Sequence, residues 1–100
     1  MTVDQKFVFR TIESNKPALS AFGIDKLGLF GSFARNQQTE NSDIDILVEF
    51  TQGKKNADSF LDLAFFLETI LHKKVDLLTP EALTPGMKSR IMNEVEYFHI

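Results

Sequence analysis

The fold is decided by the stretch SDIDILVEF, residues 42–50, in which acidic and apolar side chains alternate. Because successive side chains of a β-strand point to opposite faces, this pattern predicts a strand over residues 44–50. One face carries Ile44, Ile46, Val48 and Phe50. The other carries Asp43, Asp45, Leu47 and Glu49. The apolar face is predicted to lie in the core, and the acidic face is the candidate for chemistry.

The acidic face begins with two carboxylates that project from the same side of the strand. By the rise of a strand, Asp43 and Asp45 lie about 6 to 7 Å apart. At an effective dielectric constant near 20, two like charges about 6 Å apart repel by on the order of 3 kcal/mol, which a divalent cation would reverse. Magnesium takes oxygen ligands, and typically one or two carboxylates together with substrate phosphates and water. The pair therefore predicts a Mg²⁺ site, whereas Glu49, farther along, is predicted to be solvated or salt-bridged.

A third carboxylate, Asp76, lies in the short apolar stretch 75–78, which predicts a strand. An unpaired carboxylate buried there would be expensive, so a compensating partner is expected. If this strand lies beside residues 44–50, the three carboxylates converge. Asp76 can then bind the catalytic metal and take a proton from an attacking hydroxyl. The sequence alone leaves this adjacency open.

Gly31 and Ser32 follow a short strand predicted over residues 26–30, and we expect residues 31–35 to turn the chain into a brief helix. Glycine lets the backbone approach a ligand, and the first amides of a helix point outward without partners. We therefore interpret Gly31 and Ser32 as a phosphate seat. Arg35 is predicted to contact a phosphate or, alternatively, to form an ordinary surface salt bridge. The alternative for Ser32 is a simple helix cap.

The rest of the chain predicts helices that pack around these strands. The expected elements are a helix over residues 3–14, a short helix from Asn15 to Gly23, a polar loop over 36–42, a turn over 52–56, a helix from Ser59 to about residue 72, a helix from Pro85 to about residue 95 and an edge strand over 97–100. Ser59 and Asp62 form a capping-box pattern at the start of the long helix. Its core stripe consists of Phe60, Leu63, Ala64, Leu67, Ile70 and Leu71.

Composition restricts the classes of function. One hundred residues with 43% hydrophobic content suffice for one compact core, so we expect a single domain over residues 1–100. No apolar stretch approaches the roughly 18 residues of a membrane span, and the N-terminus is too polar for a signal peptide, so we expect no membrane contact and a cytoplasmic protein. The absence of cysteine excludes thiolate zinc sites and a cysteine nucleophile. A net charge of -3 without a long basic run argues against broad nucleic-acid binding.

Three motifs occur in order: LFGSFAR at 29–35, SDIDILV at 42–48 and KVDLL at 74–78. Together they resemble the minimal nucleotidyltransferases of the DNA polymerase beta superfamily over roughly residues 22–98. The resemblance implies an α/β (α+β) nucleotidyltransferase fold, a short mixed β-sheet flanked by helices. It also implies ATP or another nucleoside triphosphate as substrate and two Mg²⁺ ions about 3.5 to 4 Å apart. The implied metal and catalytic residues are Asp43, Asp45 and Asp76.

Proteins of this kind are often antitoxins encoded beside a HEPN-domain ribonuclease toxin, and some inactivate the toxin by transferring adenylyl groups from ATP to one of its tyrosines. The resemblance thus implies a HEPN-domain partner and a protein acceptor. Two positions depart from the family pattern: Asn36 stands where glycine is usual, and Asn41 where proline is usual. Asparagine tolerates the left-handed conformation, so the turn at Asn36 is expected to survive. The change at Asn41 makes the loop less rigid without touching the predicted ligands.

Two alternatives to a protein adenylyltransferase remain open. The chain could neutralise its toxin by contact, as a binding module without catalysis, or it could transfer the nucleotide to a small-molecule or nucleic-acid acceptor. The short chain weakens the second alternative, because such enzymes usually need a further domain to hold the acceptor. Leu61 and Phe65 lie away from the core stripe of the long helix. They are predicted either to cover a neighbouring loop or to mark a homo- or hetero-oligomer interface.

Overall fold

The computed structural model describes residues 2–51, 53 and 56–100. The elements follow in the order α1 (Gln5–Ser14), α2 (Lys16–Ser20), β1 (Ile24–Phe30), β2 (Ile44–Phe50), α3 (Ala57–Leu71), β3 (Val75–Leu78), the 3-10 turn η1 (Pro80–Ala82), α4 (Pro85–Met92) and β4 (Glu96–His99). Strands β2 and β3 have the predicted bounds. The predicted turn over 52–56 includes Gln52, Lys54 and Lys55, which lie outside the described residues.

The described strands form one mixed sheet in the order β3-β2-β1-β4. Strand β1 is antiparallel to both β2 and β4, whereas β2 and β3 are parallel and are connected through α3. The last strand lies at the edge of the sheet, as predicted. In the parallel pair, Asp45 is opposite Asp76. The adjacency that the sequence left open is therefore present, and it places the third carboxylate beside the first two.

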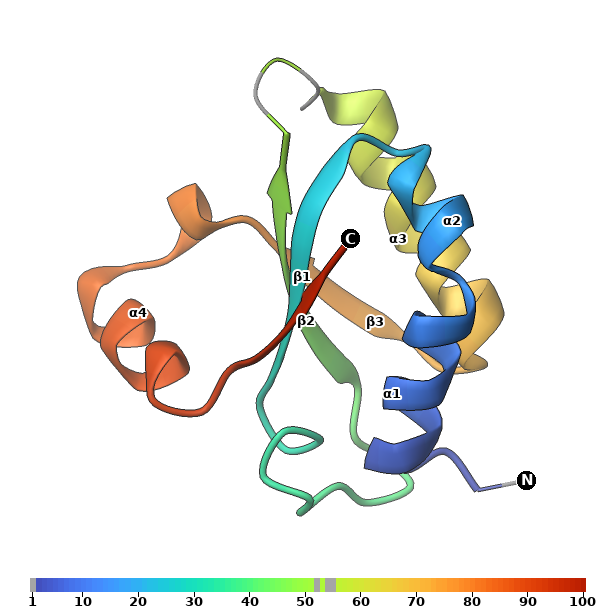
Figure 1. Ribbon diagram of the computed structural model, residues 1–100. Coiled ribbons are helices and arrows are strands. Elements are labelled where there is room, and N and C mark those ends of the chain that lie inside the picture. The colour runs from blue at the N-terminus through green and yellow to red at the C-terminus, as the bar shows by residue number, and fades with distance from the viewer. Residues whose placement is uncertain (1, 52, 54–55) are drawn as a thin grey trace.

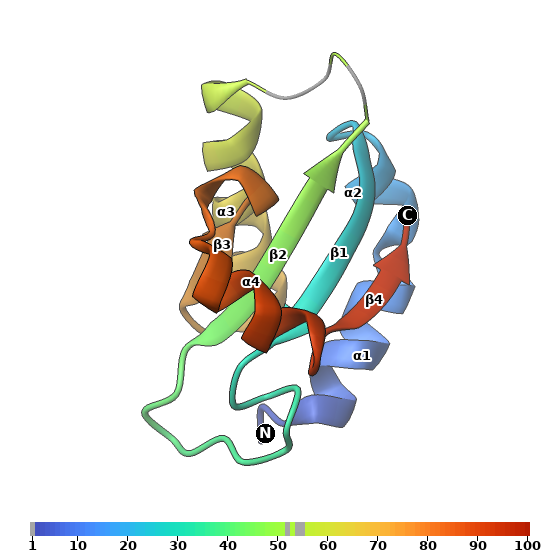
Figure 2. The ribbon, with the colours of Figure 1, turned by 90° about the vertical axis from the view of Figure 1, so that its left-hand side faces the viewer.

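The two faces of the sheet are covered unequally (Figure 1). Helices α1, α2 and α3 pack on one face, while α4 and the short turn η1 lie on the other, with α4 in front of β2 (Figure 2). The three-helix side encloses the main core, to which β2 contributes its predicted apolar positions Ile44, Ile46 and Val48, all 0% exposed. The predicted stripe of α3 is also confirmed, with Leu63, Leu67 and Leu71 fully buried and Phe60, Ala64 and Ile70 packed beside them.

A smaller apolar cluster forms beneath α4. Its buried members are Phe30 of β1, Leu47 of β2 and Ile91 of α4. Leu47 lies on the face that also carries Asp45, yet it is 0% exposed because α4 covers it. The same face of β2 is thus apolar under the helix and acidic at the end of the strand.

The brief helix predicted over residues 31–35 is wrong, because the structure has turns from residue 31 to residue 36. The backbone N–H of Arg35 donates to the carbonyl of Gly31 at 3.2 Å, and that of Gln37 to the carbonyl of Ser32 at 2.8 Å. Asn36 takes the left-handed conformation, with φ of 56°. This conformation stops helical propagation after one turn, and it confirms that asparagine serves at the position where the family usually has glycine.

The capping box predicted from Ser59 and Asp62 is also wrong. Asn56 has an extended backbone and its side chain accepts a hydrogen bond from the N–H of Ser59 at 2.8 Å. Ser59 is therefore the third residue of the helix, not its cap, and α3 begins at Ala57. An asparagine side chain is as good a cap as serine, and here Asn56 has the extended backbone of a cap residue.

Candidate active site

A cleft of about 740 Å³ opens on the face of the sheet that α4 partly covers. Its walls come from the turn after β1, the start of β2, the strand β3 and the helix α4. All residues predicted to act in catalysis, metal binding or phosphate binding line it: Gly31, Ser32, Arg35, Asp43, Asp45 and Asp76. The structure therefore brings together side chains from three separate motifs of the sequence.

Sheet register places the glycine turn directly beside the carboxylates. Phe30 is opposite Asp45, so Gly31 follows at the end of β1 next to the same carboxylate. Gly31 has φ of +75°, and a Cβ atom on it would lie 2.1 Å from Asp45 Oδ2. Real Cβ atoms cannot approach an oxygen that closely, and this backbone conformation is also unfavourable for residues with a Cβ. Glycine is required here because the Cβ of any other residue would overlap the Asp45 carboxylate.

The three aspartates differ in exposure. Asp43 and Asp76 are exposed, whereas Asp45 is partly buried between its neighbours. Burial of its carboxylate, followed by repulsion from Asp76, Asp43 and Glu94, raises the pKa of Asp45 from 3.8 to about 6, and Arg35 lowers it. Asp76 is exposed in the open cleft, because β3 is an edge strand, so the cost for which a compensating partner is expected does not arise there. It is the charged form of Asp45 that partial burial and the neighbouring carboxylates disfavour.

The chemistry of this cluster fits a hard divalent cation. Its donors are carboxylate oxygens, and the pKa of Asp45 is raised first by burial and then by repulsion from Asp76, Asp43 and Glu94, both of which a cation would offset. Among residues 2–51, 53 and 56–100, no three carboxylate or imidazole groups are arranged to hold a metal by themselves. Magnesium usually needs only one or two carboxylates when phosphate and water complete its coordination. The arrangement therefore suits a metal that arrives with a phosphate substrate better than a permanently bound ion.

Arg35 is occupied by a contact that sequence reasoning missed. Its Nη1 lies 2.9 Å from Glu94 Oε1, and the other carboxylate oxygen of Glu94 accepts the backbone N–H of Gly31. Glu94 thus joins the segment after α4 to both ends of the Gly31–Arg35 turn. Of the two alternatives stated for Arg35, the structure shows the salt bridge.

The predicted phosphate-binding turn at Gly31 and Ser32 consequently offers fewer free hydrogen-bond donors than expected. It is a turn with no helix behind it, and the Gly31 amide is already bonded to Glu94. Ser32 lines the cleft, and its hydroxyl has no hydrogen-bond partner among the described residues. The Ser32 hydroxyl is therefore a donor that is available to a ligand on this side of the cleft.

The opposite wall is formed by α4, whose contribution the sequence did not reveal. Met87, Arg90 and Ile91 line the cleft together with Glu94, which follows the helix. Their spacing of three, four and seven residues is that of one helical face. The sequence predicts a helix here, but nothing local to it shows that the charged residues on this face line the same cleft as the aspartates.

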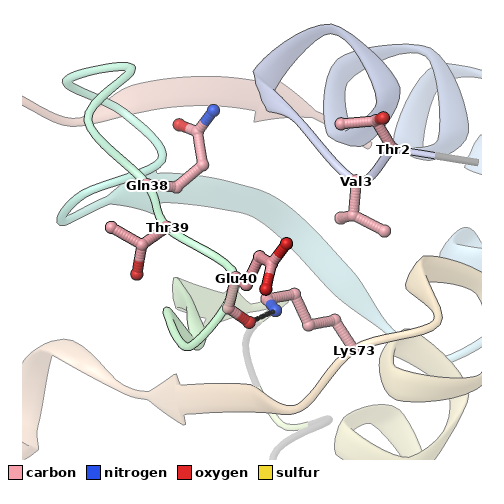
Figure 3. Close-up of a pocket in the computed structure, with 6 residues that line it drawn as sticks. All are labelled: Thr2, Val3, Gln38, Thr39, Glu40 and Lys73. Atoms are coloured by element: carbon pink, nitrogen blue, oxygen red, sulfur yellow. Dashed lines mark hydrogen bonds between the residues drawn. The ribbon is translucent and has the colours of Figure 1, made fainter.

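A second hollow of about 500 Å³ lies between the N-terminal segment and the polar loop (Figure 3). It contains none of the predicted site residues. In Figure 3, the Nζ of Lys73 reaches the backbone carbonyl of Glu40, and their separation is 2.7 Å. This contact, together with the bond from the N–H of Thr39 to Ser42 Oγ at 2.9 Å, holds the loop that leads into Asp43. The contacts beside the second hollow thus hold the loop that leads into Asp43.

Two further predictions concern the surface. Leu61 and Phe65 on α3 are 64% and 73% exposed, so they do not cover a loop, and their role as an interface stays a prediction. Glu49 is paired with Lys26 at 3.6 Å, in agreement with the prediction that it is solvated or salt-bridged. Within the described part of the chain, the helices are too short or too polar to cross a bilayer.

Comparison with known proteins agrees with this geometry. A family model described as "Nucleotidyltransferase domain" matches residues 12–98. The "Putative protein adenylyltransferase MJ0435" of Methanocaldococcus jannaschii is 49% identical over 78 residues, which cover 78% of this chain and 83% of that protein. "Protein adenylyltransferase MntA" of Thermococcus cleftensis is 37% identical over 76 residues, 76% of each chain.

Solved structures share the fold. One, described as a "putative minimal nucleotidyltransferase", superposes with a TM-score of 0.80 at 27% identity and covers 93% of this chain and 94% of its own. A chain from a Shewanella oneidensis complex, described as a tri-AMPylated HEPN toxin with its MNT antitoxin, gives a TM-score of 0.56 at 19% identity over 85% of this chain and 69% of that one. At that identity the second likeness concerns the fold alone.

Proposed function

Because the chain belongs to the nucleotidyltransferase domain family, we propose that it transfers AMP from ATP to a hydroxyl group of a partner protein. The single observation that carries the proposal is the meeting of Asp43, Asp45 and Asp76 in one cleft, beside the Gly31-Ser32 turn. The fold predicted from the sequence, a mixed sheet flanked by helices, is confirmed by the solved nucleotidyltransferase.

Asp43, Asp45 and Asp76 are the residues we propose as metal ligands, with two Mg²⁺ ions as the expected cofactor. Magnesium, when bound, would neutralise the triphosphate and stabilise charge on the attacking and leaving oxygens. The partial burial of Asp45 makes this carboxylate a poor solitary anion and a good partner for a cation. Ser32, at the end of β1, is placed to donate its hydroxyl to a phosphate oxygen.

In the proposed reaction the acceptor hydroxyl oxygen forms a bond to the α-phosphorus of ATP. The bond from that phosphorus to the oxygen bridging the β-phosphate breaks, and pyrophosphate leaves. The exposed carboxylate of Asp76 accepts the proton of the hydroxyl. Its position on the edge strand β3 favours this role, since a protein acceptor can reach an edge strand without displacing the sheet.

The proposed acceptor is a tyrosine of a HEPN-domain toxin, which makes the chain an antitoxin. Support comes from the two relatives named as protein adenylyltransferases, of which one is an MntA protein, and from the fold shared with an MNT antitoxin solved with its AMPylated toxin. The chain covers more than three quarters of both relatives, so the likeness extends over most of their length.

The test is transfer of label from α-³²P-ATP to a HEPN-domain protein supplied as the proposed partner, in the presence of Mg²⁺. The wild-type chain should label its partner, and Asp43→Asn combined with Asp45→Asn should reduce the rate by about 10³-fold or more, as expected for loss of a charge-stabilising group. Glu49→Gln is the matched control, because Glu49 lies on the same face of β2 but is paired with Lys26.

Three outcomes would count against the proposal. An unlabelled partner that is nevertheless neutralised would favour an antitoxin that acts by contact alone. Label that persists in the double variant would remove the aspartates from catalysis. Label that appears on a small molecule or nucleic acid, with none on the partner, would indicate a different acceptor class.

A further inference from the structure

Two arginines line the cleft, and they are not equivalent. The guanidinium of Arg35 is held by Glu94 at 2.9 Å. Arg90 also lines the cleft, but its side chain has no ion pair or hydrogen bond with any described residue. An arginine that faces a cluster of carboxylates without being paired to one is a cation available to a ligand.

Arg90 is presented by a helix that is fixed at both ends. The hydroxyl of Thr84 caps the start of α4 by accepting the N–H of Met87 at 3.2 Å. Ile91, the next residue along, is 1% exposed in the cluster with Phe30 and Leu47. After the helix, Glu94 is bonded to the Gly31–Arg35 turn. These contacts set the face of α4 toward the cleft, and Arg90 belongs to that face.

The proposed substrate needs a cation on this wall. ATP carries a charge of about -4 near neutral pH, and the described carboxylates of the cleft add further negative charge. Cations bound by the aspartates would neutralise part of this charge, and a cation on α4 would offset more of it from the opposite wall. The guanidinium of arginine offers a planar set of N–H donors that fits phosphate oxygens in pairs.

We infer that Arg90, not Arg35, is the cationic contact for the phosphate tail of the nucleotide, an inference that rests on the function proposed above. Arg35 then acts as a positioning residue, which with Glu94 holds the Gly31-Ser32 turn in place. The two arginines therefore predict different behaviour on substitution: loss of Arg90 weakens binding of phosphates, and loss of Arg35 loosens the turn.

The experiment is equilibrium binding of Mg·ATP and of AMP by isothermal titration calorimetry, with no partner present. Arg90→Gln should weaken Mg·ATP binding about 10- to 100-fold, as expected for a charge-assisted contact worth about 1.5 to 3 kcal/mol, and leave AMP nearly unchanged. The affinity of Arg90→Lys for Mg·ATP should lie between those of the wild type and Arg90→Gln, because lysine keeps the charge without the planar guanidinium. Lys88→Gln is the matched control, since Lys88 is an exposed cation on α4 that does not line the cleft.

Arg90 lies in the last turn of α4, where a cation also interacts favourably with the helix dipole, so thermal unfolding of each variant is measured as well. A wild-type chain that binds no nucleotide would overturn the proposed function and this inference with it. A wild-type chain that binds Mg·ATP, with an Arg90→Gln variant that binds it equally well, would overturn the inference alone. Equal losses for ATP and AMP would also overturn it, because they would place Arg90 on the base or ribose. If Arg90→Gln fails to fold, the affinity of Arg90→Lys for Mg·ATP is used instead. An Arg90→Lys variant that binds Mg·ATP as tightly as the wild type, with Lys88→Gln also unchanged, would show that the planar guanidinium has no role and would overturn the inference.

Discussion

The two faces of the sheet use the same strands in opposite ways. On the side of α1, α2 and α3, side chains such as Ile46 and Leu67 are fully buried in an apolar core. On the side of α4, one short helix covers Leu47 but leaves Asp45 beside an open cleft. The difference teaches that stability comes from the closed face, and that incomplete cover on the other face makes room for charged groups whose properties are altered by partial burial.

Leu67→Ala breaks the closed face and should have the largest effect on folding. Leu67 is 0% exposed on α3, in the centre of the main core. Removing its side chain loses hydrophobic burial and leaves a cavity, which costs about 2 to 5 kcal/mol in free energy of unfolding. Urea denaturation measures the change. Leu61→Ala on the same helix is the control and should change it by less than about 0.5 kcal/mol, since Leu61 is 64% exposed.

Gly31→Ala tests how closely the open face is built, and its expected effect is somewhat smaller. The added Cβ would have to displace the Asp45 carboxylate and would also sit in a left-handed turn. We expect a loss of about 2 to 3 kcal/mol from overpacking and conformation together, and a large loss of nucleotide transfer. Gly53→Ala separates the two causes, because Gly53 has φ of +81° but nothing within 4 Å of the added atom. It should cost about 1 kcal/mol, and equal costs at both positions would contradict the proposed crowding.

Asp45→Asn should stabilise the protein at neutral pH while removing a predicted catalytic group. The pKa of Asp45 is raised from 3.8 to about 6, mainly by burial. Its neutral form is therefore favoured by folding: this contribution is fully present below pH 3.8 and is lost as pH rises through about 6. Because the side chain is only partly buried, we discount the effect to about 1 kcal/mol.

The measurement for Asp45→Asn is the free energy of unfolding at pH 5 and pH 8 without added metal. The variant should gain on the wild type at pH 8 and gain less at pH 5, where more of Asp45 is already protonated. Asp43→Asn is the control, since Asp43 is exposed and not partly buried like Asp45. A variant less stable than wild type at pH 8 would show that the carboxylate is held by contacts that favour its charged form.

The elements with strong periodic signals could be predicted from the sequence, and the contacts that join them could not. Strands 44–50 and 75–78 have their predicted bounds because alternating or continuous apolar residues define a strand locally. The three aspartates could be named for the same reason, since two lie on one strand face and the third on the next strand. Their meeting depends on the parallel pairing of β2 with β3, which only the fold reveals.

The other half of the cleft was hidden because it depends on long-range contacts. Glu94 is 63 residues from Gly31 along the chain, and nothing near either residue indicates that they touch. The sequence predicts a helix over 31–35 because Ser32, Phe33 and Ala34 are compatible with a helix as well as with a turn, and the left-handed Asn36 and the bond to Glu94 favour the turn. Local propensity is thus least informative where the chain bends around a site.

Phe65→Asn should have the smallest effect on stability, and its neighbour makes the comparison sharp. Phe65 is 73% exposed, whereas Phe66 packs against Phe22 with ring centroids 5.4 Å apart. Urea denaturation should show a change within about 0.5 kcal/mol for Phe65→Asn and a loss of several kcal/mol for Phe66→Asn, which buries a polar group in the core.

Analytical ultracentrifugation of the chain alone and with its partner then tests the predicted interface. If Leu61 and Phe65 contact another chain, Phe65→Asn weakens that assembly while the fold persists; unchanged assembly would leave the two side chains as isolated apolar residues on a solvated helix face.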